Sequence, residues 1–273
     1  MILNSNEYMP LQPGLEQITF RYWKPPLNHF QSKLPVILFY EFKINAPDHE
    51  YVSILPDACV EIIFELNPSK PTALIGGSVL KNKEIRFLSG IQYFGIRLLP
   101  EYGIKLPDDL IIDETIPSSF FVKQEHLIEQ MLMDSSLQNC IRLFNHFIHS
   151  DAFTTRSVPG FIPYSIQQSY LNRGNIEINQ LAEKTGYTVQ YFRKKFEQYT
   201  GLTPKLFNRI IRFQSSLNNI LNQNSNLLDI VEEYGYYDQA HLIREYRKFN
   251  YLTPLQVKKT IKRNLYPHIS EIL

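Results

Sequence analysis

The chain has 273 residues, of which 44% are hydrophobic and 20% are charged, and its formal net charge is +1. This composition is that of an ordinary globular protein, and the length is sufficient for two domains with separate cores. A net charge so close to zero argues against a nucleic-acid partner for the chain as a whole. The charge is unevenly distributed, however. Residues 160–273 carry 15 Lys and Arg against 9 Asp and Glu, a net charge of +6, whereas residues 1–159 carry a net charge of −5.

The amino-acid usage predicts a cytoplasmic protein with no membrane partner. The two cysteines, Cys59 and Cys140, are too few for a disulfide scaffold and fit a reducing compartment. Residues 1–14 lack the basic start and the apolar run of a signal peptide. The longest apolar stretch without a charge, residues 34–40, is too short to span a bilayer.

The N-terminal half predicts a small antiparallel β barrel or sandwich. Residues 1–35 are interrupted by five prolines and are expected to be irregular, apart from a short strand at residues 20–23. In residues 60–66 apolar and acidic residues alternate, as they do in a strand with one buried face. Further short runs of β-branched and aromatic residues predict strands at residues 36–42, 51–55, 72–75, 85–88 and 92–98.

Two amphipathic helices are expected to follow, at residues 124–133 and 136–149, because apolar residues recur there three and four positions apart. They could cover the β-domain or pair with a second subunit. We expect the pair to form a dimer surface, since a β-domain needs at most one helix to cover an open face. Residues 151–160 are rich in Thr, Ser, Pro and Gly and predict a linker.

Residues 176–254 contain the same supersecondary unit twice, which indicates a duplicated module. In each copy a short apolar helix ends at a Gly-Tyr pair, Gly186-Tyr187 or Gly235-Tyr236, where glycine allows the chain to reverse. A second helix follows, capped by Thr188 or Asp238. Each copy closes with Leu-Thr-Pro. This order of elements is that of a helix-turn-helix.

The second helix of each copy is expected to bury one narrow apolar stripe and to present its other faces to DNA. The buried residues are expected to be Phe192, Phe196 and Tyr199 in the first copy, and Leu242, Tyr246 and Phe249 in the second. The residues expected to contact bases and phosphates are Thr188, Gln190, Tyr191, Arg193, Lys194 and Lys195, then Asp238, Gln239, His241, Arg244, Arg247 and Lys248. A bundle with solvated basic faces would explain one such unit, but two in tandem make that explanation improbable.

An apolar stripe beginning after Pro204 predicts one long helix between the two copies. About 17 residues give a rod of roughly 25 Å. A rod of that length can hold two recognition helices about one DNA turn apart, roughly 34 Å. One polypeptide would then read two successive major grooves.

The segment from about residue 162 to residue 261 resembles the DNA-binding domain of AraC/XylS-type transcription regulators. The second copy carries the most specific motif, from Gly235 through Gln239 and His241 to Arg244, followed by Phe249 and the Leu252-Thr253-Pro254 stop. The resemblance implies that the helices beginning near Thr188 and Asp238 are the two recognition helices. One departure is Tyr251, where the family usually has glycine, as Gly201 does in the first copy.

The N-terminal half resembles, more weakly, the sensor half of some AraC-type regulators, through residues 55–64 and 94–97. The resemblance implies a small-molecule effector, a homodimer formed through the N-terminal domain, and RNA polymerase as a partner. It names no ligand, and the sequence does not distinguish an activator from a repressor. The expected organisation is an N-terminal sensor and dimerisation domain in residues 1–150, a linker in residues 151–160, and an all-α DNA-binding domain in residues 161–273.

Few residues suggest other chemistry. Residues 76–78 lack the lysine and the helix of a phosphate-binding loop and are expected to form a turn. His146 and His149 have the spacing of a metal site, but no third ligand is placed with them by pattern, so we expect no metal and no cofactor.

Three residues of the β-domain are candidates for binding an effector. Arg97, at the end of an apolar strand, could bind an anion, with a salt bridge to Glu61, Glu65 or Glu101 as the alternative. Cys59 stands between acidic neighbours and is expected to be a buried structural thiol. The candidate ligand-binding residues are therefore Arg97, Cys59 and Glu61.

Two functions from different classes remain open at this point. The first is a sequence-specific transcription regulator that is not an enzyme. The second is an enzyme with a DNA-binding tail, such as an alkyl-transfer repair protein that uses Cys59 or Cys140. A repair thiol needs a lowered pKa and an ordered base or metal beside it, and the sequence places neither there. We therefore expect the regulator.

Overall fold

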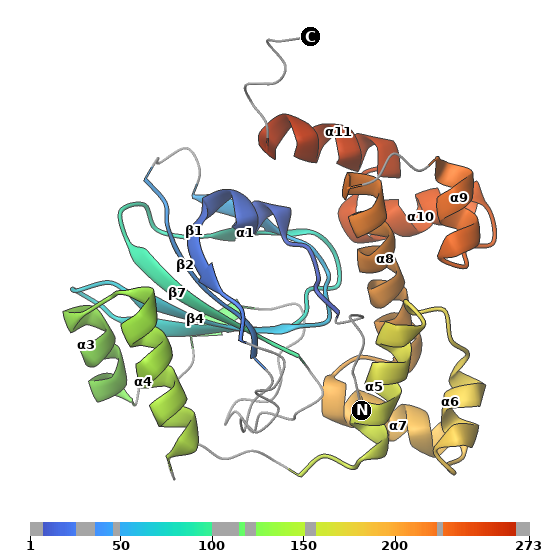
Figure 1. Cartoon of the computed structure of the whole chain (residues 1–273), viewed down its shortest axis with the longest axis horizontal. Coiled ribbons are helices and arrows are strands. Elements are labelled where there is room, and N and C mark those ends of the chain that lie inside the picture. Colours follow the sequence, from blue (N-terminus) through green and yellow to red (C-terminus); the bar gives the residue numbers. More distant parts are fainter. Residues whose placement is uncertain are drawn as a thin grey trace.

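The computed structural model describes residues 8–25, 36–45, 50–99, 115–117, 124–150, 157–222 and 226–265. In this part of the chain a β-rich N-terminal half lies beside a helical C-terminal half, and the long helix α8 (Pro204–Asn222) runs through the helical half (Figure 1). The predicted α+β class is confirmed. Among the same residues, no helix combines the length and the apolar character that a membrane crossing requires.

The N-terminal half contains two antiparallel sheets. Six strands form the larger sheet in the order β1-β2-β7-β4-β5-β8, and two form the smaller sheet, β3-β6. The strands of the larger sheet are β1 (Thr19–Trp23), β2 (Val36–Lys43), β7 (Gln92–Leu98), β4 (Val60–Leu66), β5 (Thr72–Gly76) and β8 (Thr115–Pro117). The smaller sheet pairs β3 (Tyr51–Ile54) with β6 (Lys83–Arg86).

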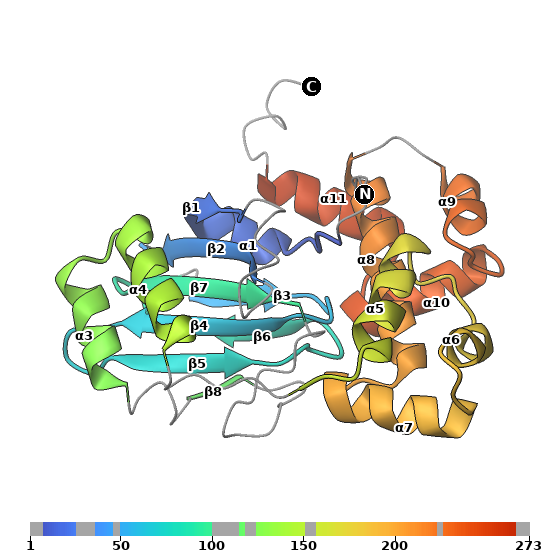
Figure 2. The ribbon, with the colours of Figure 1, turned by 60° about the horizontal axis from the view of Figure 1, so that its bottom comes forward.

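Each face of the large sheet has its own apolar cluster. Side chains that alternate along β4, such as Ile62 and Phe64, lie on the face covered by helices α3 (Glu125–Met133) and α4 (Leu137–His149). The opposite face carries Tyr40 and Phe42 and packs on the smaller sheet. In Figure 2 strands β2, β7, β4 and β5 follow one another across the sheet, with α4 beside them.

The helical pair α3–α4 covers the sheet with both of its members. Leu127, Ile128 and Met131 of α3 are buried in the same cluster as Phe144 and Phe147 of α4. The expectation that one helix would suffice is therefore wrong, because the open face is wide enough to bury the apolar stripes of both. The apolar faces of this pair are not free to form a dimer surface.

Two local predictions in the N-terminal half are also wrong. Residues 13–18, expected to be irregular, form helix α1 (Pro13–Ile18), which starts with proline and buries Leu15. The strand expected at residues 85–88 lies at Lys83–Arg86. Beyond Arg86, Phe87 is buried between Phe42 and Tyr93, and the Tyr93 hydroxyl accepts the N–H of Leu88 at 2.8 Å.

The helical half repeats one unit, as predicted. Helix α5 (Phe161–Leu171) leads into α6 (Ile178–Lys184) and α7 (Val189–Thr200); α8 then connects to α9 (Leu227–Glu233) and α10 (Gln239–Asn250). Helix α11 (Pro254–Leu265) ends the described chain. The predicted Thr-Pro start of α8 is confirmed, and the helix has 19 residues. This gives roughly 28 Å at the usual rise per residue.

The two halves share one apolar core. Leu55 and Ala58, from the turn between β3 and β4, are buried in the same cluster as the side chains of α8, and Leu11 packs against that cluster. The side chain of Gln214 in α8 donates to the carbonyl of Pro56 at 2.7 Å and accepts the N–H of Leu11 at 2.9 Å. The core of the helical half therefore includes side chains from the N-terminal half. Of the predicted linker, residues 151–156 lie outside the described residues.

Candidate nucleic-acid interface

The turn inside each unit depends on a glycine in the left-handed region. Gly186 has φ +75° and Gly235 has φ +67°. A backbone N–H closes each turn by donating to a helical carbonyl five residues earlier: Tyr187 donates to Ala182 at 3.1 Å, and Tyr236 donates to Val231 at 3.0 Å. Both helix pairs therefore reverse in the same way, as the repeated Gly-Tyr pair predicts.

The predicted N-caps of the two second helices are confirmed. The Thr188 hydroxyl accepts the N–H of Tyr191 at 3.3 Å, and the Asp238 carboxylate accepts the N–H of His241 at 2.6 Å. A carboxylate at a helix N-terminus is stabilised by the helix dipole but repels phosphate. The capping hydrogen bond thus explains why an aspartate stands at position 238, and no DNA contact is needed to explain it.

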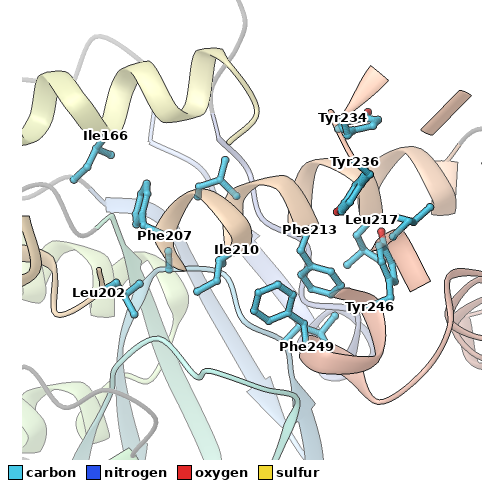
Figure 3. Packing of buried hydrophobic residues seen from close by; sticks show 14 of the residues in the cluster. Ile166, Leu202, Phe207, Ile210, Phe213, Leu217, Tyr234, Tyr236, Tyr246 and Phe249 are labelled. Atoms are coloured by element: carbon cyan, nitrogen blue, oxygen red, sulfur yellow. The ribbon is translucent and has the colours of Figure 1, made fainter. Parts of the chain in front are cut away.

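The buried stripe of each second helix packs on α8. Phe196 of α7 meets Phe207 edge-on, with ring centroids 5.4 Å apart. Phe213 meets Tyr246 and Phe249 of α10, at 5.0 and 5.2 Å. Figure 3 shows the rings of Phe207, Phe213, Tyr246 and Phe249 along α8. The predicted stripes are confirmed, except that Tyr199 is only half-buried. Packing on α8 positions α7 and α10, which we call the recognition helices.

Burial fixes which faces of the recognition helices meet solvent. The exposed residues among those predicted to contact DNA are Thr188, Gln190, Tyr191, Arg193, Lys194, Asp238, Gln239, Arg244, Arg247 and Lys248. No ion pair found among the described residues uses a basic side chain of either recognition helix. These faces therefore present positive charge that the protein itself does not neutralise.

Two predicted contact residues have partners within the protein. Lys195 is half-buried and donates to Gln198 at 3.0 Å. His241 is half-buried, and its Nδ1 accepts the N–H of Tyr237 at 3.2 Å while its ring lies edge-on to Tyr236. His241 therefore fixes the turn before α10, and only its other ring nitrogen is left for a base or a phosphate.

One exposed aromatic residue of this surface was not predicted. Tyr237 is 90% exposed and lies in the turn directly before the Asp238 cap. The second turn is one residue longer than the first, since two residues separate Gly235 from its cap and one separates Gly186 from Thr188. An alignment of the two copies would have revealed Tyr237 as the additional residue.

Residues 181–260 match a protein-family model described as a helix-turn-helix domain. The match spans both units and falls within the segment that resembles the AraC/XylS type.

The C-terminal part of this chain is an AraC-type helix-turn-helix domain.

The chain also matches a curated relative. The chain is 30% identical over 84 residues to an uncharacterized HTH-type transcriptional regulator of Haemophilus influenzae. The match covers 31% of this chain and 28% of that relative, so the chain spans less than a third of the relative's length.

The chain is also similar to solved structures, at low sequence identity. One is the C-terminal domain of AraT, a response regulator from Geobacillus stearothermophilus, which is 17% identical to this chain. The match covers 38% of this chain and 88% of the AraT chain, with a TM-score of 0.36. Another is ToxT from Vibrio cholerae, in a structure with a bound unsaturated fatty acid, which is 9% identical to this chain. The match covers 82% of this chain and 93% of the ToxT chain, with a TM-score of 0.41.

The three candidate effector residues of the N-terminal half lie together at the end of β4 and β7. Glu61 and Arg97 face each other across the two strands and form an ion pair, and Arg97 lies 3.8 Å from Asp57. The backbone N–H of Cys59 donates to the same Asp57 carboxylate at 2.9 Å. The guanidinium is buried and already paired with two carboxylates. An anionic effector at Arg97 would therefore have to displace one of them.

Burial determines the protonation of this cluster. It raises the pKa of Glu61 to about 7, although the nearby Arg97 favours the charged form. Burial opposes the charge of Arg97, but Glu61 and Asp57 raise the pKa of the guanidinium above its ordinary value, so it stays charged. The Tyr40 hydroxyl donates to Glu61 at 2.9 Å, and burial raises the pKa of Tyr40 as well. Glu61 is thus the group of this cluster that titrates near neutrality.

We expect the free energy of unfolding to fall as the pH rises from about 4.5 to about 7. The folded protein holds the Glu61 proton more tightly than the unfolded chain, whose carboxyl has the ordinary value of 4.5. The contribution is at most about 3 kcal/mol. Urea unfolding of the wild type and of Glu61→Gln across this range would measure it. The variant should lose this part of the pH dependence and the control Glu84→Gln, an exposed residue, should keep it; equal slopes in all three would contradict the role of Glu61.

The two thiols are buried. Burial raises the pKa of Cys140 to about 12, which disfavours the thiolate that alkyl transfer requires. The Cys59 thiol donates to the backbone carbonyl of Asp57 at 3.6 Å, the contact of a structural cysteine. The burial of both thiols and the raised pKa of Cys140 therefore do not support the repair alternative.

Proposed function

We propose that this protein is a transcription regulator that reads two successive major grooves of double-stranded DNA with α7 and α10. The observation that carries this proposal is the pair of helix-turn-helix units mounted on one helix, α8, each with an exposed basic face. The roughly 28 Å of α8 is comparable to the roughly 34 Å of one DNA turn. This spacing supports simultaneous insertion of both recognition helices.

Polar contacts of α8 hold the two units at a fixed separation. Arg209 forms a two-pronged ion pair with Glu245 of α10, with both N···O distances at 2.7 Å. Arg212 donates to the carbonyl of Gly174, ahead of α6, at 3.0 Å and to that of Gly235, in the second turn, at 3.3 Å. A bidentate pair and a bridging guanidinium keep rigid elements in register. This rigidity supports recognition of one defined half-site spacing.

The proposal assigns sensing to the N-terminal half, residues 1–150, and DNA binding to residues 161–273. Its support is the shared core around Leu55, Ala58 and Gln214, through which a change in the β-domain would reach α8. The resemblance to the AraC/XylS type adds two further partners to the proposal, a second copy of the chain and RNA polymerase.

The direct test of the proposed function is to incubate the purified full-length protein with fragments of its own genome and to sequence the fragments that it retains. A regulator that reads two grooves should enrich sites with two short conserved blocks about one DNA turn apart. Uniform recovery of the genome would overturn the proposal.

We expect Arg244→Ala to weaken binding to such a site by about 1–3 kcal/mol and to relax base preference at one position. The reason is that an exposed arginine on a recognition helix can form two hydrogen bonds to the O6 and N7 atoms of guanine. Gel-shift titration against a panel of single-base variants of the site would measure both effects. The matched control is Arg142→Ala, which removes an exposed arginine of α4 in the N-terminal half. An equal loss of affinity for every sequence would make Arg244 a phosphate contact instead.

A further inference from the structure

The C-terminal end of α10 is completed by a residue of the N-terminal half. The backbone N–H of Asn82 donates to the carbonyl of Phe249 at 2.6 Å, and the Asn82 side chain donates to Oδ1 of Asn250 at 2.7 Å. The Ser53 hydroxyl donates to Oδ1 of Asn82 at 2.6 Å and fixes the orientation of its amide. Asn82 directly precedes β6, so the smaller sheet carries it to the end of the second recognition helix.

These contacts supply what the end of a helix lacks. The last four carbonyls of an α-helix have no donor within the helix, and a buried one needs a partner from elsewhere. Phe249 and Asn250 are both buried. Asn82 therefore satisfies two groups of the last turn of α10 that water does not reach.

The first recognition helix closes its C-terminus with its own residues. The Thr200 hydroxyl donates to the carbonyl of Phe196 at 2.8 Å and accepts the N–H of Leu202 at 3.2 Å. Gly201 follows in the left-handed conformation, with φ +76°, which glycine adopts without strain. No contact with the N-terminal half is needed for this closure.

The second recognition helix also ends at a left-handed residue, and the N–H of Tyr251 donates to the carbonyl of Arg247 at 3.0 Å, but it has neither the threonine nor the glycine. Asn250 stands where α7 has Thr200, and its side chain bonds to Asn82. Tyr251 stands where α7 has Gly201, with φ +59°, a left-handed conformation that is strained for a residue with a side chain. Tyr251 is 63% exposed, so packing of its ring does little to hold that conformation. Tyr251, which replaces the usual glycine, therefore directly follows the two residues that Asn82 contacts, Phe249 and Asn250.

The second anchor between the halves lies beside the same unit. Gln214 adjoins Phe213, whose ring packs on Tyr246 and Phe249 of α10. Gln214 bonds to Leu11 and Pro56 of the N-terminal half, as described above. The N-terminal half thus holds both α10 and the part of α8 on which α10 packs.

We propose that docking of the N-terminal half is required to complete α10 but not α7, so that a change in the N-terminal half acts selectively on the second recognition helix. When the halves separate, the last turn of α10 loses its cap and frays, while α7 keeps its structure. The expected consequence for DNA binding is that contact with the second half-site is lost before contact with the first, and this consequence rests on the proposed function. The structural claim, that α10 frays and α7 does not, is independent of the proposed function.

Hydrogen exchange of the full-length protein, without DNA, tests the structural part. Asn82→Ala removes the side-chain bond to Asn250 and keeps the backbone N–H that donates to Phe249. In this variant the amides of the last turn of α10 and of residues 251–253 should exchange at least about tenfold faster, whereas those of α7 should change less than about twofold. Lys81→Ala, which removes the exposed neighbouring side chain, is the matched control and should leave both helices unchanged. Equal acceleration in α7 and α10, or none in α10, would overturn the proposal.

A second variant separates capping from a general loss of stability. Adding Tyr251→Gly to Asn82→Ala relieves the left-handed strain and should restore slow exchange to the end of α10, because the helix can then close as α7 does. Exchange that stays fast in the double variant would show that Asn82 acts by another route, and it would also overturn the proposal.

The readout on DNA is kept apart from the exchange measurement. On a retained genomic site, Asn82→Ala should lower affinity and leave the remaining footprint on the block contacted by α7. If the wild type retains no specific DNA, the proposed function fails while the exchange result still decides the capping role. The inference fails, and the proposed function stands, if the protein binds specific DNA but Asn82→Ala changes neither readout. In that outcome the footprint keeps its length and the amides of α10 stay protected from hydrogen exchange.

Discussion

Raising the salt concentration from 50 to 200 mM is expected to weaken specific DNA binding by this nearly neutral protein by about 10³–10⁵. Counterions released from six to ten contacted phosphates produce an effect of that size. The net charge of +6 in residues 160–273 sets the local field, whatever the charge of the whole chain. The exposed Arg193, Lys194, Arg247 and Lys248 belong to the two recognition helices and are the nearest sources of such contacts.

The measurement is a series of gel-shift or fluorescence titrations at increasing salt, plotted as log affinity against log salt. Replacing one phosphate-contacting lysine, in Lys194→Ala or Lys248→Ala, should reduce the slope by about 1. The charge-matched control Lys70→Ala, in an exposed turn of the N-terminal half, should leave it unchanged. A flat response of the wild type would mean that the basic half is not the binding surface.

Replacing Arg97 by methionine is expected to lower the free energy of unfolding by about 3–5 kcal/mol. The substitution leaves the buried carboxyls of Glu61 and Asp57 without their cation. Each must then stay charged without a partner or take up a proton, and an uncompensated buried charge costs far more than the lost ion pair contributes. Urea unfolding at neutral pH gives the value directly. Combining Arg97→Met with Glu61→Gln and Asp57→Asn should recover most of the loss, since no buried charge then remains.

The control for this experiment is the exposed pair of Arg86 and Glu50. Arg86→Met should leave the unfolding transition almost unchanged, because ion pairs in water contribute little. A similarly small effect of Arg97→Met would show that water reaches the Arg97 cluster and that its burial does not govern its energetics.

The sequence predicted the helical C-terminal half more completely than the β-rich N-terminal half, for a physical reason. A helix-turn-helix is a local structure, and its determinants lie within a few residues of one another: a turn glycine, a cap such as Thr188, and a stripe such as Phe192 and Phe196. Most of the β-strands were also predicted, because alternation along one strand is a local signal. The bounds of the strand Lys83–Arg86 follow its pairing with β3, a partner distant in the sequence.

The contacts between the halves could not be predicted, because they join residues with no local pattern in common. Gln214 on a helix and Leu11 in an N-terminal segment are 203 positions apart. Asn82 looked like an ordinary turn residue, and only Tyr251 in place of glycine indicated that the end of α10 differs from that of α7. The pairing of Arg97 with Glu61 was anticipated as an alternative to anion binding, and the strand register brings these two residues face to face.

The shared core also limits how such a protein can be recombined in evolution or in the laboratory. The turn that carries Leu55 and Ala58 fits a surface formed by α8 and its neighbours, and Ala58 holds a left-handed backbone, with φ +59°, to do so. A chimera that joins this DNA-binding half to a foreign sensor would leave that surface unfilled unless the turn is transplanted with it. The β3–β4 turn and α8 therefore behave as one inherited unit, although they lie on opposite sides of the predicted domain boundary.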